Sequence, residues 1–225
     1  MVNKLLIDLD GTLLDFNEGE KNAFISTIKH FTGYEPTDYE CNKFSVINEY
    51  YFNEYRLGKM DRNEFHFKRF NDIYSFLKLS GDIEKSDNYY VDSLKYQSNL
   101  YSDVVDSLKY LYKKYDLYIA SNGMTEVQKK RLNLACIDKY FKKIYVSEEI
   151  GYNKPDKEFF EYIFKDLNDY DINNYAIIGD RLESDILGGI NAGIKTIYLR
   201  RNEILRDDIK PDYEILGLDE INKIL

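Results

Sequence analysis

Cysteine and histidine are scarce in this chain, with two of each among 225 residues. Cys41 and Cys136 lie far apart and form no Cys-x-x-Cys pair, which predicts two ordinary thiols in a reducing compartment. His30 and His66 form no His-x-x-x-His pattern and leave no credible Ser-His-Asp set. The sequence therefore argues against a disulfide framework, a zinc site of that kind and a serine-histidine mechanism.

Long apolar runs and excess positive charge are also lacking. No apolar run approaches ~18 residues, so we expect no membrane span, and the apolar stretch before Asp8 is too short for a signal peptide. The net charge of −9 argues against nucleic-acid wrapping and docking on anionic membranes. It does not exclude a small anionic substrate, because a bound cation can reverse the local field. We therefore expect a cytoplasmic monomer or homodimer that acts on a small molecule.

Strand and helix patterns alternate over most of the chain, and an apolar content of 44% is ordinary for a protein that buries a core. Helical periodicity occupies residues 104–115, 157–166 and 183–192. Short apolar runs typical of buried strands occupy residues 2–9, 117–120, 144–146, 175–178, 196–199 and 213–216. This alternation predicts an α/β fold with a doubly wound, parallel (Rossmann-like) sheet.

A long stretch near the N-terminus interrupts the alternation. Gly33, Gly58 and Gly81 divide it into segments with apolar and aromatic residues at i, i+3 and i+4. We expect an inserted all-helical domain over residues 16–97, with residues 1–15 and 98–225 forming the α/β core domain. Its aromatic side chains should mostly form its own core, although they could also offer a stacking surface for a base.

Two carboxylates follow the first predicted strand, in Asp8-Leu9-Asp10-Gly11-Thr12. Strand side chains alternate in direction, so those of Asp8 and Asp10 should point the same way. One carboxylate can attack phosphorus, and a second beside it can protonate the leaving oxygen and then activate water. A polar strand-to-turn junction is the structural alternative for this segment alone.

A hydroxyl and a lysine follow later strands. Ser121-Asn122-Gly123 lies between a strand and a helix, and the free amides of a helix N-terminus can bind an anion. We therefore take Ser121, Asn122 and Gly123 as candidates for binding phosphoryl oxygens. Lys154-Pro155 precedes another helix, and a fixed lysine there could neutralise developing charge. A capped turn and a surface lysine are the alternatives if each motif is taken alone.

Two more carboxylates complete the set. Asp180 ends the strand predicted at 175–178, and Asp185 lies about one turn into the next helix. Carboxylate oxygens suit Mg²⁺, which typically takes one or two of them together with substrate and water. Ligands bind at the carboxyl ends of the strands in an open parallel sheet, so all four motifs should meet at one edge. Together they predict a Mg²⁺-dependent phosphoryl-transfer site.

This ordered set resembles the phosphatases of the haloacid dehalogenase-like (HAD) superfamily over the whole chain. The resemblance implies that Asp8 is the nucleophile and that Asp10 is the general acid and base. It further implies that Ser121 binds the phosphoryl group and that Lys154 stabilises its charge. The helical insertion looks like the C1 cap of that superfamily, a lid that excludes water and carries specificity.

The same resemblance implies the metal ligands. Asp8, the backbone carbonyl of Asp10, and Asp180 would hold Mg²⁺, with Asp185 supporting them from nearby. Among the polar residues of the cap, we single out Arg69 as the one to contact substrate.

Two further stretches are similar to the bacterial pyrimidine 5′-nucleotidase branch of the superfamily. They are residues 147–151 (SEEIG) leading into Lys154-Pro155, and residues 183–193 (ESDILGGINAG). The implied substrate is a nucleoside monophosphate. The chain departs from that family at Tyr101-Ser102, where Pro-Gly is often found at the return from the cap.

Three other functions share parts of this pattern. Sugar-phosphate or phosphoglycolate phosphatases use the same core chemistry, and a β-phosphoglucomutase-like enzyme would return the phosphoryl group to a sugar. A non-catalytic binding protein would retain the fold, but the full set of core residues disfavours it. Dehalogenases of the superfamily lack the second aspartate, so Asp10 argues against that reaction.

Overall fold

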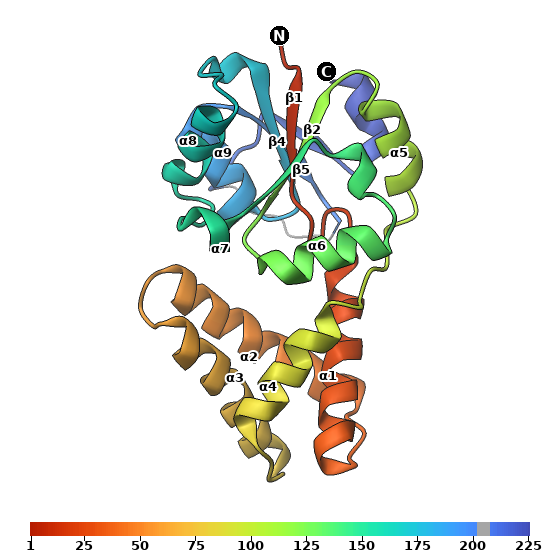
Figure 1. The fold of residues 1–225 in the computed structure, drawn as a ribbon, viewed down its shortest axis with the longest axis vertical. Helices are drawn as coiled ribbons and strands as arrows, with labels where there is room; N and C mark the ends of the chain where they lie inside the picture. Colours follow the sequence, from red (N-terminus) through yellow and green to blue (C-terminus); the bar gives the residue numbers. More distant parts are fainter. Residues whose placement is uncertain (202–207) are drawn as a thin grey trace. The chain divides into compact units, whose positions relative to one another are not determined.

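The computed structural model describes residues 1–201 and 208–225, which divide into two compact units: residues 16–97, and residues 1–15 together with 98–225. The second unit contains a sheet with the strand order β3-β2-β1-β4-β5-β6, in which every neighbouring pair is parallel (Figure 1). The predicted parallel α/β fold is thus confirmed. The strands are β1 Lys4–Ile7, β2 Asp116–Ser121, β3 Lys143–Val146, β4 Tyr175–Gly179, β5 Lys195–Leu199 and β6 Tyr213–Ile215.

The central strand β1 is apolar on both sides because helices cover both faces of the sheet. Leu5 and Ile7 belong to one buried cluster together with Leu108 of α5 (Val104–Leu111). Leu6 points to the other face, where it shares a cluster with Phe159 of α8 (Lys157–Asp166). Figure 1 shows α5 on one side of the sheet and α8 and α9 (Leu187–Ala192) on the other. Each such buried side chain contributes about 1.5–3 kcal/mol, so the strand ends are anchored on a rigid core.

The segment after β4 differs from the prediction of one helix over 183–192. It forms a wide turn, η3 (Leu182–Ile186), followed by α9 (Leu187–Ala192), which ends at Gly193 in a left-handed conformation. The amide N–H of Ile186 donates to the carbonyl of Arg181 at 3.3 Å, a five-residue spacing that widens the first turn. Asp185 lies in this turn, and its carboxylate accepts a hydrogen bond from the amide of Arg181 at 3.1 Å.

The regular secondary structure of residues 16–97 is helical throughout. The helices are α1 Phe16–Thr32, α2 Asp38–Arg56, α3 Arg62–Leu77 and α4 Ile83–Leu94. Capping boxes begin two of them: Thr37 with Glu40 at α2, and Asp61 with Glu64 at α3. Gly33 ends α1 in the left-handed conformation that favours glycine.

Aromatic side chains fill much of the interior of this helical unit. Phe24 and Phe44 stack with ring centroids 4.2 Å apart, and Phe70 and Tyr90 pack against Phe44. Other aromatic side chains, such as that of Phe67, are exposed. Packing within the unit therefore accounts for Phe24, Phe44, Phe70 and Tyr90.

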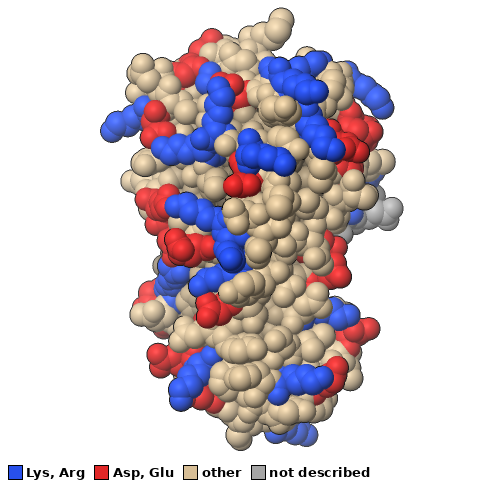
Figure 2. Space-filling view, turned by 45° about the vertical axis from the view of Figure 1, so that its right-hand side comes forward, with Lys and Arg blue, Asp and Glu red and all other residues tan. Residues whose placement is uncertain are grey.

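The surface carries both signs of charge. Figure 2 shows Lys and Arg side chains interspersed with Asp and Glu, and many of them form ion pairs such as Lys142–Asp116 at 2.6 Å. Among the described helices, none combines the length and the apolar run that crossing a bilayer requires. Cys41 and Cys136 are both free thiols.

Candidate active site

The predicted site residues lie at the carboxyl ends of three adjacent strands. Asp8 follows β1, Ser121 ends β2, and Asp180 follows β4. Because β2, β1 and β4 are neighbours and parallel, these ends share one edge of the sheet. The topology therefore gathers residues that are more than a hundred positions apart in the chain.

Lys154 is the centre of this group of residues. Its ammonium donates to the carboxylate of Asp8 at 2.7 Å, to that of Asp185 at 2.5 Å, and to the carbonyl of Ala120 at 2.5 Å. Only 1% of Lys154 is exposed to solvent. A buried ammonium that is bonded to two carboxylates and one carbonyl has all three protons satisfied, so its position is fixed.

Asn122 holds the backbone of Lys154. Its side-chain amide donates to the carbonyl of Lys154 and accepts from the amide of Lys154, both at 2.8 Å. The side chain of Asn122 therefore positions the lysine. That Asn122 and Gly123 bind substrate stays a prediction.

Three carboxylates form a potential cation site. Asp8, Asp180 and Asp185 each offer an oxygen, and these oxygens all lie within 4.8 Å of one another. Thr12 donates to the carboxylate of Asp180 at 2.8 Å and so orients it. With Lys154 included, the four ionised side chains carry a formal charge of −2, which one divalent cation would balance. Hard oxygen donors and this charge fit Mg²⁺.

The pKa values of these groups reflect their crowding. Burial raises the pKa of Asp8 well above its ordinary value, Lys154 opposes this rise, and Asp185 and Asp180 add to it. Burial and Asp185 raise the pKa of Asp180 to about 7. Burial lowers the pKa of Lys154, but attraction to Asp185 and Asp8 outweighs it, so the net shift is upward. Without a cation, the site thus disfavours the ionised form of Asp8 and Asp180.

Two glycines leave room for these carboxylates. A Cβ on Gly11, whose φ is +83°, would collide with the carboxylate of Asp180. A Cβ on Gly179 would collide with the carboxylate of Asp185. Both positions need the absence of a side chain for close packing, and Gly11 also needs the backbone freedom of glycine.

Two residues in direct contact with Asp10 were not predicted from the sequence. Gln128 donates from its amide nitrogen to the carboxylate of Asp10 at 2.5 Å, and Arg131 forms an ion pair with the same carboxylate. Both lie on α6 (Thr125–Leu134) and are 1% exposed. Their spacing of three residues on a helix face shared with buried Val127 and Leu132 was a signal that these polar side chains are buried.

Arg69 lies within the helical unit and is 3% exposed. Its guanidinium donates to Asp87 at 2.7 Å and to Asn48 at 3.0 Å, and it lies over the rings of Phe65 and Tyr90. These contacts give Arg69 a structural role in the packing of that unit. Its contact with substrate stays a prediction.

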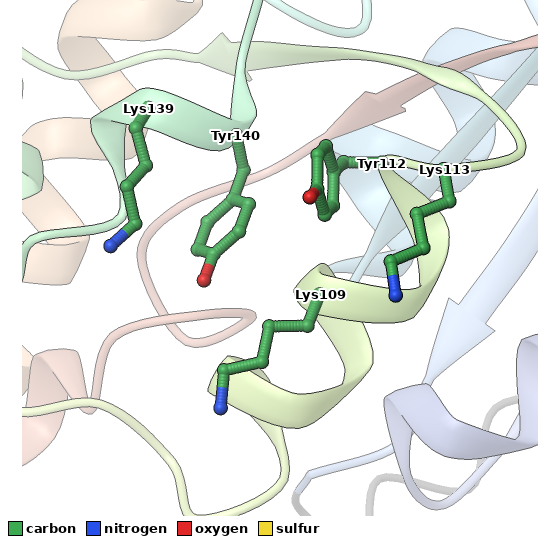
Figure 3. Close-up of a pocket in the computed structure, with 5 residues that line it drawn as sticks. All are labelled: Lys109, Tyr112, Lys113, Lys139 and Tyr140. Carbon is green, nitrogen blue, oxygen red and sulfur yellow. The ribbon is translucent and has the colours of Figure 1, made fainter.

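A separate pocket of about 460 Å³ contains none of the predicted site residues. Lys109, Tyr112 and Lys113 line it from α5 and the turn after it, and Lys139 and Tyr140 line it from the short helix η1 (Asp138–Tyr140) (Figure 3). Lys109 is already paired with Asp106 at 2.9 Å. None of these five lining residues belongs to the carboxylate cluster of Asp8, Asp180 and Asp185.

The sequence signature of the family described as haloacid dehalogenase-like hydrolase spans residues 5–199. The chain belongs to this family, as the resemblance of its motifs implied.

Individual relatives match over nearly the whole chain. HAD-hydrolase YfnB from Bacillus subtilis is 32% identical over 98% of this chain and 94% of its own length. Its crystal structure, described as bound to magnesium, superposes with a TM-score of 0.93 over 100% of this chain and 98% of that one.

Two further relatives are named as pyrimidine 5′-nucleotidases. Pyrimidine 5′-nucleotidase PynA from Streptococcus pneumoniae is 31% identical and covers 96% of this chain and 92% of its own. Pyrimidine 5′-nucleotidase YjjG from Escherichia coli is 26% identical and covers 98% of this chain and 96% of its own.

Proposed function

We propose that this hydrolase is a Mg²⁺-dependent phosphomonoesterase that works through an aspartyl-phosphate intermediate. The observation that carries the proposal is the contact of Lys154 with both Asp8 and Asp185, in a cluster with Asp180. A buried carboxylate beside a fixed ammonium and a divalent-cation site is suited to attack on a phosphoryl group.

The reaction has two steps. First, an oxygen of Asp8 attacks phosphorus, the bond from phosphorus to the ester oxygen breaks, and Asp10 gives its proton to that leaving oxygen. Second, Asp10 takes a proton from water as the water oxygen attacks phosphorus and the Asp8–phosphorus bond breaks. Inorganic phosphate leaves, and both aspartates return to their starting states.

Lys154 and Ser121 stabilise charge in both steps. The ammonium of Lys154 stays next to Asp8 while charge moves between that carboxylate and the phosphoryl oxygens. Ser121 accepts a hydrogen bond from the amide of Gly123 at 3.1 Å, which orients its hydroxyl at the start of the loop before α6. In this role the hydroxyl donates to a phosphoryl oxygen.

Asp8, the backbone carbonyl of Asp10, and Asp180 would hold Mg²⁺, with Asp185 beside them. When bound, the cation neutralises the carboxylates and the charge of the phosphoryl oxygens. The magnesium named for the YfnB structure supports this assignment.

For the substrate, we propose pyrimidine nucleoside monophosphates. The support comes from PynA and YjjG, which match this chain almost end to end. We also propose a cytoplasmic location, because Cys41 and Cys136 are free thiols and such thiols are typical of a reducing compartment.

The test is release of inorganic phosphate from dUMP, dTMP, UMP, other nucleoside monophosphates, phosphoglycolate, and hexose and pentose phosphates, with Mg²⁺ and with EDTA. Asp8→Asn should abolish turnover. Asp116→Asn is the matched control, because Asp116 begins β2 at the opposite end of that strand from Ser121. We expect pyrimidine monophosphates to be preferred and EDTA to stop the reaction.

Other outcomes would correct the proposal in defined ways. A preference for sugar phosphates or phosphoglycolate would retain the mechanism and reject the substrate. Conversion of a hexose 1-phosphate to the 6-phosphate without phosphate release would indicate a mutase. Phosphate release that survives Asp8→Asn would reject the aspartyl-phosphate mechanism itself.

A further inference from the structure

Two buried side chains of α6 hold both oxygens of the Asp10 carboxylate. The guanidinium of Arg131 pairs with Oδ1, and the amide of Gln128 donates to Oδ2 at 2.5 Å. Gln128 and Arg131 also contact each other at 3.2 Å. The side chain of Asp10 is 25% exposed, so it meets solvent on one side and two fixed donors on the other.

Gln128 also contacts Ser121, the candidate phosphoryl-binding residue. Its amide nitrogen donates to the hydroxyl oxygen of Ser121 at 2.9 Å, and the same oxygen accepts from the amide of Gly123. With two donors directed at its oxygen, Ser121 keeps its own proton to donate. Within residues 1–201 and 208–225, the Ser121 hydroxyl accepts these two hydrogen bonds and donates none. One amide therefore orients both a carboxylate and a hydroxyl.

The backbone around α6 is shaped for this arrangement. A Cβ on Gly123 would collide with the side-chain amide of Gln128, so the glycine makes room for it. The carboxylate of Glu148 accepts from the amide of Thr125 at 2.7 Å and fixes the first turn of the helix. Three residues separate Gln128 from Arg131, so they lie on the same face of α6.

Packing alone does not account for Arg131. Removing a guanidinium from water is costly, and apolar residues of similar volume are often at least as stabilising as a buried ion pair. Arg131 is nevertheless 1% exposed and pairs with the carboxylate of Asp10. Nη1 of the planar guanidinium fork donates both to Asp10 and to the amide oxygen of Gln128, so Arg131 joins the two side chains in a way that a point charge would not.

We propose that Gln128 and Arg131 are positioning residues that fix the carboxyl group of Asp10 for proton transfer, and that Gln128 aligns the Ser121 hydroxyl with it. This inference rests on the proposed function. As the bond from phosphorus to the ester oxygen breaks, the electron pair goes to that oxygen, which takes the proton of Asp10. A carboxyl group that rotates freely would deliver the proton less often.

The leaving group provides the test. An alkyl alcohol is a poor leaving group and needs the proton, whereas 2,4-dinitrophenolate leaves without it. The variants Gln128→Met and Arg131→Met should lower kcat/KM for the best alkyl monophosphate by roughly 10²-fold, in the range of general acid catalysis. Arg131→Met should lower kcat/KM for 2,4-dinitrophenyl phosphate by less than about threefold, because kcat/KM reports only the steps up to departure of the leaving group, and this leaving group needs no proton. Gln128→Met should lower that constant by more than Arg131→Met does, because Ser121 also loses a donor, but by less than it lowers the constant for the alkyl ester.

Controls separate positioning from folding. Lys130→Met removes an exposed cation from the same helix and should leave both constants unchanged. Arg131→Lys retains the charge without the fork and should restore part of the alkyl-ester rate. If Arg131→Met fails to fold, as judged by circular dichroism, Gln128→Met alone carries the test, because it replaces an amide by a side chain of similar size.

A double-mutant cycle with Asp10→Asn completes the experiment. If Arg131 acts through Asp10, Arg131→Met should cost no further activity in the Asp10→Asn background. Equal losses on both classes of ester, or a further loss in that background, would overturn the inference while leaving the phosphatase assignment intact. A wild-type chain that releases no phosphate from any ester would overturn both.

Discussion

Replacing Lys154 by Met should destabilise the metal-free protein strongly. The variant loses the ammonium that bonds the carboxylates of Asp8 and Asp185 at 2.7 and 2.5 Å, and both partners are buried. Removing one partner from a buried ion pair costs about 3–5 kcal/mol, because the other charge stays in a medium that solvates it poorly. For a protein of this size, the expected fall in the melting temperature is roughly 10 °C.

The contribution of Lys154 to the free energy of unfolding is fully present at neutral pH, so the effect of its loss can be measured there. The net pKa shift of Lys154 is upward, because the attraction of Asp185 and Asp8 outweighs the effect of burial. The ammonium therefore contributes its full stabilisation below its ordinary pKa of ~10.4 and loses it only as the pH rises beyond that value. Denaturant unfolding of wild type and Lys154→Met at pH 7 with EDTA should show the whole effect.

Two further variants sharpen this measurement. Lys157→Met removes an exposed lysine that pairs with Glu161 at 3.2 Å, and it should cost less than about 1 kcal/mol. Adding Asp185→Asn to Lys154→Met should recover part of the stability, because one unpaired carboxylate disappears. Added Mg²⁺ should also stabilise the Lys154→Met variant. The reasoning is refuted if Lys154→Met costs less than about 1 kcal/mol, or if the double variant is less stable than the single one.

Three other changes should have measurable effects. Gly11→Ala should abolish Mg²⁺ binding by calorimetry and lower turnover at least 100-fold, since the new Cβ collides with the carboxylate of Asp180; unaltered Mg²⁺ affinity would contradict this. Because burial and Asp185 raise the pKa of Asp180 to about 7, the folded metal-free chain holds a proton over roughly pH 4–7 that the unfolded chain has lost. The titration of Asp180 should therefore make the metal-free protein less stable as the pH rises through that window. Binding of Mg²⁺ near pH 6 should release this proton, so the calorimetric heat of binding should depend on the buffer. Binding heats that are the same in all buffers would argue against this. Arg69→Met should lower the stability of the helical unit by about 3 kcal/mol because Asp87 loses its partner, whereas exposed Lys68→Met should be neutral in the same thermal melt.

Much of the arrangement at the sheet edge follows from local sequence. Apolar runs ending in Asp8, Ser121 and Asp180 predict strands that end in polar residues, and parallel strands present those ends at one edge. The spacing of three and four residues between apolar side chains likewise predicts the helical stretch at 16–97. These signals are short in range, so the sequence carries them without knowledge of the fold.

Other contacts depend on chain segments that meet only in the folded protein. Arg131 pairs with Asp10 across 121 positions of sequence, and Gln128 reaches it across 118. In the sequence, the helix face that they share with Val127 and Leu132 indicates burial, but no local pattern identifies Asp10 as their partner. Asn122 is a similar case, because its amide is committed to the backbone of Lys154 and that pairing requires two loops to meet.

The sequence by itself therefore determined the class of fold, the order of the motifs and the chemical types of the side chains, because periodicity and strand-end residues are local properties. The tertiary structure decided which donors face which carboxylates. It placed Lys154 between Asp8 and Asp185, and it turned two polar residues of α6 inward to Asp10. The physical reason is that burial and hydrogen bonding depend on neighbours in space, which strand order and helix packing select.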